Sequence, residues 1–168
     1  MFRICRWLEY DANVARPLGI VVALANRLRW SQKMVNASRH KILIIEKQPN
    51  YTQPVVKQVL FAGLLPLIAV TGEGGLRKAI EHHPDLILLE LDLTDMDGLE
   101  FVSLLKEKPQ LEQIPIIAMS IFPYMKNAAL YGGCDDFLKK PVKMIDLMGH
   151  IRRFLYEAPS VSPKRLAR

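Results

Sequence analysis

The chain has 168 residues, of which 50% are hydrophobic and 24% charged, with a formal net charge of +6. This composition is ordinary for a soluble globular protein and excludes a disordered, collagen-like or coiled-coil chain. The two cysteines, Cys5 and Cys134, exclude a disulfide scaffold and a cysteine-based zinc site, and they favour a reducing compartment, which we expect to be the cytoplasm.

The N-terminal residues 1–39 are basic, with seven Lys and Arg side chains against two acidic ones. The apolar run 18–25 within them is far too short to span a bilayer. We interpret it as part of a helix over about residues 17–33, with Pro17 in the first turn. Two alternatives stay open. One is a signal peptide, which the acidic residues upstream disfavour. The other is an upstream extension of the reading frame, with Met34 as the true start.

From residue 41 onward, short aliphatic runs alternate with segments of helical periodicity. We expect strands over residues 42–45, 65–70, 86–91, 114–119 and 137–138. We expect helices over residues 54–63, 71–83, 98–108, 123–130 and 144–156. Five such alternating units predict an α/β fold with a parallel sheet covered on both faces. At this size, the flavodoxin-like doubly wound strand order 2-1-3-4-5 is the expected topology.

Polar side chains stand where the expected strands end. They are Glu46, Lys47, Glu90, Ser120 and Lys140. Ligands and chemistry in doubly wound sheets lie beyond the carboxyl ends of the strands, so we expect these side chains to lie at one edge of the sheet.

These positions, taken with three longer segments, resemble the receiver domain of bacterial response regulators, the CheY-like family. The segments are PDLILLELDLTDMDG at 84–98, IPIIAMS at 114–120 and GCDDFLKKPV at 133–142. The resemblance implies three regions: a basic N-terminal extension (1–39), a receiver domain (40–157) and a basic C-terminal tail (158–168).

In that family, an Asp at a strand end accepts a phosphoryl group from a histidine kinase, and two acidic residues help to bind Mg²⁺. A Ser or Thr and a Lys contact the phosphoryl oxygens, because phosphoryl transfer needs cations and donors around them. The resemblance implies the following equivalents: Glu90 for the phosphoacceptor, Glu46 and Lys47 for the acidic-pocket positions, Ser120 and Lys140 for the phosphoryl contacts, and Phe137 for the switch aromatic.

Three of these positions depart from the family pattern. Glu90 replaces the acceptor Asp, Glu46 is one methylene longer than the family's Asp, and Lys47 replaces an acid. Lys47 would place an ammonium near the position of the metal, so we doubt Mg²⁺ binding and expect no cofactor. We expect a pseudo-receiver whose pocket is a cluster of ion pairs, with Asp92 pointing to solvent. Glu90 then either imitates a phosphorylated Asp or is simply inactive.

The expected function is that of a stand-alone receiver protein in two-component phosphorelay signalling, not an enzyme, acting through protein–protein interaction. The partner would be a histidine kinase or a downstream target bound by the face of the fourth helix, fifth strand and fifth helix. On this face we expect Tyr124, Met125, Asn127, Lys143, Met144 and Leu147. The alternative is a nucleic-acid-associated regulator that acts through its basic ends, with Arg27, Arg29 and Trp30 as candidate contacts.

Overall fold

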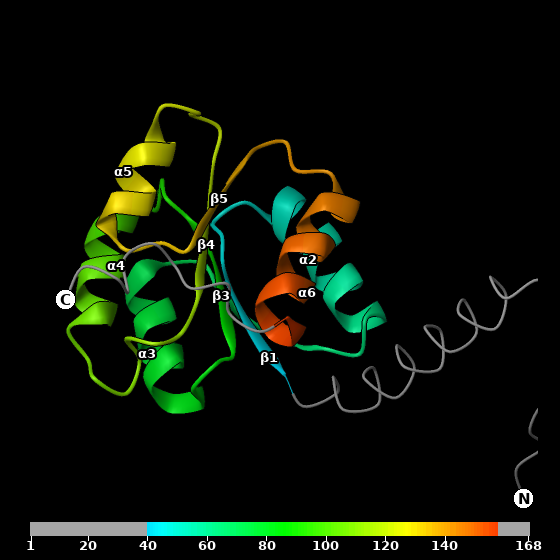
Figure 1. Cartoon of the computed structure of the whole chain (residues 1–168), viewed down its shortest axis with the longest axis horizontal. Helices are drawn as coiled ribbons and strands as arrows, with labels where there is room; N and C mark the ends of the chain where they lie inside the picture. Colours follow the sequence, from blue (N-terminus) through cyan, green and yellow to red (C-terminus); the bar gives the residue numbers. More distant parts are fainter. Residues whose placement is uncertain (1–39, 158–168) are drawn as a thin grey trace, which may run out of the picture.

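Five short strands lie side by side at the centre of the computed structural model, which describes residues 40–157 (Figure 1). The strands are β1 (Lys41–Ile45), β2 (Leu65–Ala69), β3 (Leu86–Glu90), β4 (Ile116–Ser120) and β5 (Asp136–Lys139). The helices are α2 (Pro49–Phe61), α3 (Gly72–His82), α4 (Gly98–Lys106), α5 (Met125–Gly132) and α6 (Met144–Tyr156). All neighbouring strands are parallel and lie in the order β2-β1-β3-β4-β5, which confirms the predicted flavodoxin-like topology.

The helices cover both faces of the sheet, with α2 and α6 on one face and α3, α4 and α5 on the other (Figure 1). Successive strand residues point to opposite faces, so β1 supplies both layers of the core. Its Ile42 and Ile44 pack under α2 and α6, whereas Leu43 and Ile45 pack under the other three helices. All four side chains are fully buried, as the unbroken aliphatic run predicts.

Helix α2 begins earlier than the sequence pattern indicated. Pro49 occupies its first turn, and Pro54, which we expected at the N-terminus, lies inside the helix. Both prolines satisfy the local preference for a helix start, since proline lacks the N–H that a first turn leaves unpaired. Thr52 and Val55 are buried against the sheet, and this packing holds the additional turn in helical form.

Several expectations fall on residues that the structure does not describe. They are the helix over 17–33, the basic extension 1–39, the basic tail 158–168 and the nucleic-acid contacts proposed for Arg27, Arg29 and Trp30. Within residues 40–157, no helix is long and apolar enough to cross a membrane.

The loop between β3 and α4 is fastened to the start of α3 by Asp95. Its carboxylate accepts hydrogen bonds from the backbone N–H groups of Gly72 (2.8 Å) and Glu73 (2.9 Å). These hydrogen bonds lower the pKa of the Asp95 carboxyl below its ordinary value of 3.8. The bond from Glu73 has the largest effect on this pKa, and the bond from Gly72 has the second largest. A negative charge at a helix N-terminus also complements the helix dipole.

Replacing Asp95 with Asn is therefore expected to lower the free energy of unfolding at pH 7 by about 0.5 kcal/mol, a small loss because the carboxylate is exposed. The lowered pKa means that the stabilisation is complete above the unfolded-state pKa and is lost as pH falls through the folded-state pKa. Urea unfolding of both proteins at pH 7 and pH 3 measures this. An equal difference at the two pH values would contradict the assignment.

Candidate functional site

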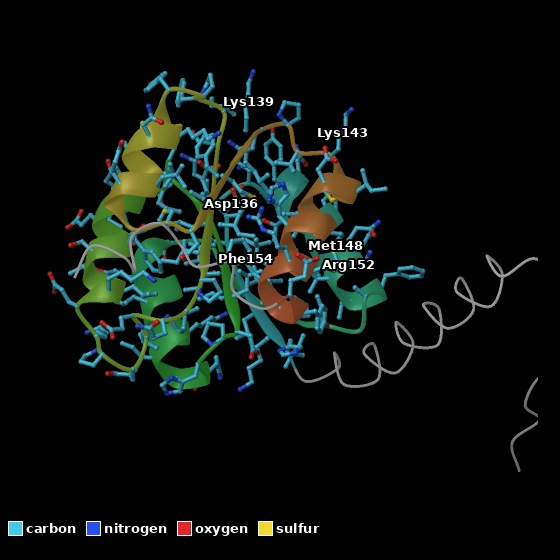
Figure 2. All side chains as sticks on the ribbon, in the orientation of Figure 1. Asp136, Lys139, Lys143, Met148, Arg152 and Phe154 are labelled. Carbon is cyan, nitrogen blue, oxygen red and sulfur yellow. The ribbon has the colours of Figure 1, made fainter. Side chains whose placement is uncertain are left out.

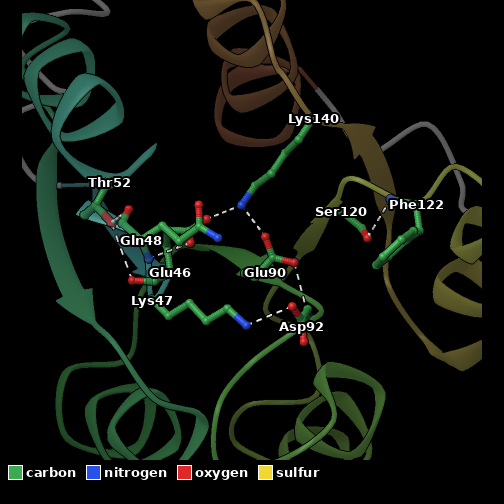
Figure 3. A network of polar contacts seen from close by, with 9 residues as sticks. All are labelled: Glu46, Lys47, Gln48, Thr52, Glu90, Asp92, Ser120, Phe122 and Lys140. Carbon is green, nitrogen blue, oxygen red and sulfur yellow. Dashed lines mark hydrogen bonds and ion pairs between the residues drawn. The ribbon is translucent and has the colours of Figure 1, made fainter. Parts of the chain in front are cut away.

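The polar residues singled out in the sequence lie at the carboxyl edge of the sheet (Figure 3). Glu46 directly follows β1, Glu90 ends β3, Ser120 ends β4 and Lys140 directly follows β5. Parallel strands in this order carry these four positions to the same edge, although they are far apart in the sequence. All four residues are buried, with exposed fractions of 5% or less.

Lys140 is the centre of the site. Its ammonium forms ion pairs with Glu46 Oε2 and with Glu90 Oε2. It also lies over the ring of Tyr51, with Nζ 4.3 Å from the ring centroid. An ammonium has three N–H donors. Two are directed to carboxylates and the third side of the group faces an aromatic ring, a favourable setting for a buried cation.

The remaining oxygens of the two carboxylates are held by backbone donors. Glu46 Oε1 accepts from the N–H of Gln48 at 2.8 Å, and Glu90 Oε1 accepts from the N–H of Asp92 at 2.9 Å. Each buried carboxylate thus accepts one backbone hydrogen bond and one ion pair. Satisfied in this way, a buried charge network is fixed in one geometry.

Lys47 does not enter the buried cluster. Its ammonium pairs with Asp92 Oδ2 at 2.8 Å, and the side chains of Lys47 and Asp92 are 24% and 65% exposed. Asp92 was expected to point to solvent; it is largely exposed, yet it holds Lys47 at the rim of the site. With all groups ionised, the five side chains of the two clusters (Glu46, Glu90, Asp92, Lys47 and Lys140) have a net charge of −1.

The other two candidates stand apart from this network. Ser120 Oγ accepts a hydrogen bond from the N–H of Phe122 at 3.1 Å, and no hydrogen bond joins Ser120 to Glu90 within residues 40–157 (Figure 3). Phe137 is 9% exposed and belongs to the apolar cluster under α3, α4 and α5. The geometry therefore unites Glu46, Glu90 and Lys140, and leaves Ser120 beside them.

The side chains predicted for the partner face on α5, β5 and α6 differ in exposure. Tyr124 is 72% exposed and Asn127 is exposed, whereas Met125 and Met144 are half-buried. Ile145, which was not among the predicted residues, is 80% exposed beside them. Lys143, which stands just before α6, also lies at the surface (Figure 2). Leu147 was expected on this face, and that prediction is wrong. Its side chain lies on the inner side of α6 and is fully buried. Helical spacing turns Leu147 toward the sheet together with Met148 and Ile151.

Comparisons with known proteins agree with this architecture. A family model described as the response regulator receiver domain matches residues 42–152. The polar-differentiation response regulator DivK of Brucella ovis is 34% identical over 90 residues, which cover 52% of this chain and 73% of the relative. The hybrid signal transduction histidine kinase G of Dictyostelium discoideum is 31% identical over 134 residues, which cover 77% of this chain and 4% of the relative.

Solved structures give the same result for the fold. The chemotaxis response regulator CheY4 of Vibrio cholerae matches with a TM-score of 0.65 and 25% identity, over 69% of this chain and 98% of that chain. The fold and these matches thus define a receiver domain of two-component signalling. The chain belongs to the response regulator receiver domain family.

Proposed function

We propose that this chain is a pseudo-receiver, which acts in two-component signalling by binding a partner protein without accepting a phosphoryl group at position 90. The observation that carries the proposal is that the Lys140 ammonium is already paired with two carboxylates. In the family this lysine contacts the phosphoryl oxygens, whereas here its ammonium is buried between Glu46 and Glu90. An incoming phosphoryl group would have to displace an ion pair that water does not screen.

A metal site is part of this proposal. The receiver domain of the sensor histidine kinase PA1611 from Pseudomonas aeruginosa has a magnesium ion coordinated in its active site cleft. The residues of this chain do not fit such an ion. Lys47 replaces an acidic oxygen ligand, and one oxygen of each remaining carboxylate is paired with Lys140. Within residues 40–157, no group of three or more His, Cys, Asp or Glu side chains is arranged to hold a metal.

Glu90 imitates a phosphorylated aspartate at most in part. A phosphoryl group would contact both Lys140 and Ser120 in the family arrangement. Glu90 reaches Lys140, but Ser120 Oγ instead accepts from the backbone of Phe122. This geometry favours a site held in one state by ion pairs over full imitation of the phosphorylated form.

Two further parts of the proposal concern the setting. The partner would be a histidine kinase or a downstream signalling protein that binds the exposed side chains of the α5–β5–α6 face, such as Tyr124 and Ile145. We also propose that the protein works in the cytoplasm and catalyses no reaction of its own.

An amide NMR titration of the full chain with Mg²⁺ and beryllofluoride, which imitates a phosphoryl group, tests the proposal. The wild type is compared with the double variant Glu90→Asp, Lys47→Asp, which restores two acidic positions. We expect no response from the wild type, and shifts around Ser120, Phe137 and Lys140 in the double variant.

A matched control is the double variant Glu90→Asn, Lys47→Asp, which has the shorter side chain without the acceptor carboxylate. It should remain silent. A wild-type response centred on Glu90 would overturn the proposal, because the ion pairs would then not exclude the phosphoryl analogue.

A further inference from the structure

We propose that a cavity between α2 and α6 binds a compact apolar molecule that carries one hydrogen-bond donor. The cavity has a volume of about 180 Å³, and its wall includes the buried pair Glu46 and Lys140. This inference goes beyond the proposed function and does not depend on it, because it concerns a binding site beside the ion pairs and not the phosphoacceptor position.

The size and the walls fit an aromatic or branched aliphatic body. A dry, apolar cavity of about 150 Å³ is large enough to bind benzene. Here the apolar lining includes Val55, Leu147 and Met144, of which the first two are buried. Methionine side chains adapt to the shape of a ligand, because the thioether is flexible and polarisable.

The polar part of the wall favours a donor on the ligand. Carboxylates only accept hydrogen bonds, so Glu46 can receive one more from a ligand. Lys140 is poorly placed to donate a hydrogen bond to a ligand, because its ammonium is paired with Glu46 and Glu90 and its remaining side faces the ring of Tyr51. A ligand that is anionic, or that can only accept hydrogen bonds, would therefore lie against the buried Glu46 carboxylate and find no free donor in the cavity wall.

The electrostatic setting favours a neutral donor over a full cation. The ion-pair clusters have a net charge of −1 when all groups are ionised. Asn50, in the first turn of α2, and Met144, the first residue of α6, line the same cavity, so the positive ends of two helix dipoles offset part of this charge. A hydroxyl or a neutral N–H group donates a hydrogen bond and carries no charge, so it suits this cavity.

Tyr51 links the cavity to the ion pairs. Its side chain lines the cavity and its ring lies on the Lys140 ammonium. A ligand that moves this ring would change the surroundings of Lys140, and the receiver would then respond to a small molecule where its relatives respond to phosphorylation.

Amide and methionine-methyl NMR titrations of the full chain with phenol, anisole and benzoate test the inference. Phenol carries the donor, anisole has the same ring without it, and benzoate is anionic. We expect phenol to bind with a dissociation constant of about 1 mM, which is reasonable for so small a ligand. Shifts should centre on Tyr51, Val142 and Met144. Anisole and benzoate should bind about tenfold more weakly, the cost of one hydrogen bond to a charged group.

Variants locate the site. Met144→Trp should fill the cavity and abolish the phenol shifts, whereas Met125→Trp should leave them unchanged, since Met125 is the half-buried first residue of α5 on the other face. Glu46→Gln should reduce the preference for phenol over anisole to less than about threefold. If Met144→Trp does not fold, Val142→Phe replaces it.

Equal binding of phenol and anisole to the wild type would overturn the inference. Shifts that persist in Met144→Trp, or the absence of saturable shifts with any of the three molecules, would also overturn it. None of these results would bear on the beryllofluoride titration, so the two proposals fail independently.

Discussion

Replacing Lys140 with methionine is expected to lower the free energy of unfolding at pH 7 by about 3 to 5 kcal/mol, the usual cost of leaving buried charges without their partner. Methionine approximates the stem of lysine and removes the ammonium. The side chains of Glu46 and Glu90 are 1% and 6% exposed, so water cannot replace the lost ion pairs. Urea unfolding followed by circular dichroism measures the difference.

Two controls separate charge from packing. Lys47→Met removes an ammonium from the exposed pair with Asp92 and should cost less than about 1 kcal/mol. The triple variant Lys140→Met, Glu46→Gln, Glu90→Gln removes all three buried charges and should recover most of the lost stability. A loss below about 1 kcal/mol for Lys140→Met alone would show that its carboxylate partners are hydrated or neutral in the folded protein.

Replacing Gly98 with alanine is expected to cost about 3 kcal/mol, at the upper end of what overpacking costs in a rigid core. An added Cβ would lie 2.6 Å from Leu91 Cα and 2.8 Å from Leu91 O. Both neighbours are backbone atoms, and Gly98 donates its N–H to that same carbonyl at 2.9 Å. The loop cannot relax without moving the end of β3, which carries Glu90.

Gly149→Ala is the matched control. Gly149 lies in α6, and an added Cβ would meet no atom within 4 Å. Alanine there should stabilise the protein by about 0.5 to 1 kcal/mol, because it restricts the unfolded chain and favours the helix. Urea unfolding of both variants tests the pair. No loss of stability from Gly98→Ala would contradict the close contact at Leu91, and a loss from Gly149→Ala would contradict the open space around that position.

The strands and the sheet order could be predicted from the sequence, because each strand is a short apolar run bounded by turn residues. The runs of the central strands β1, β3 and β4 are almost entirely buried, whereas the edge strand β2 leaves Leu65 and Ile68 exposed. The last helix has the predicted bounds, 144–156, since its apolar side chains repeat at helical spacing over its whole length. The start of α2 was predicted five residues too late, because two prolines offer the same local signal and only packing against the sheet chooses between them.

The part of the site that depends on the sheet could also be predicted from the sequence. Parallel topology alone places Glu46, Glu90 and Lys140 at one edge. The pairing of Lys47 with Asp92 depends on the path of two loops, which no periodic pattern specifies. Tyr51 was missed because the error in α2 left it outside the helix, whereas in the structure the first turn of α2 carries its ring over Lys140.

The shared ion pairs have a consequence for how this chain can change over evolutionary time. Because Glu46 and Glu90 depend on the same ammonium, the loss of Lys140 would be selected against for stability alone, even in a protein that no longer relays a phosphoryl group. A lysine at this position therefore does not by itself indicate that a receiver domain still accepts a phosphoryl group. Under the proposed function, restoring a phosphorylatable pocket would require changes at both Glu90 and Lys47, and the change at Glu90 would disturb a buried ion pair.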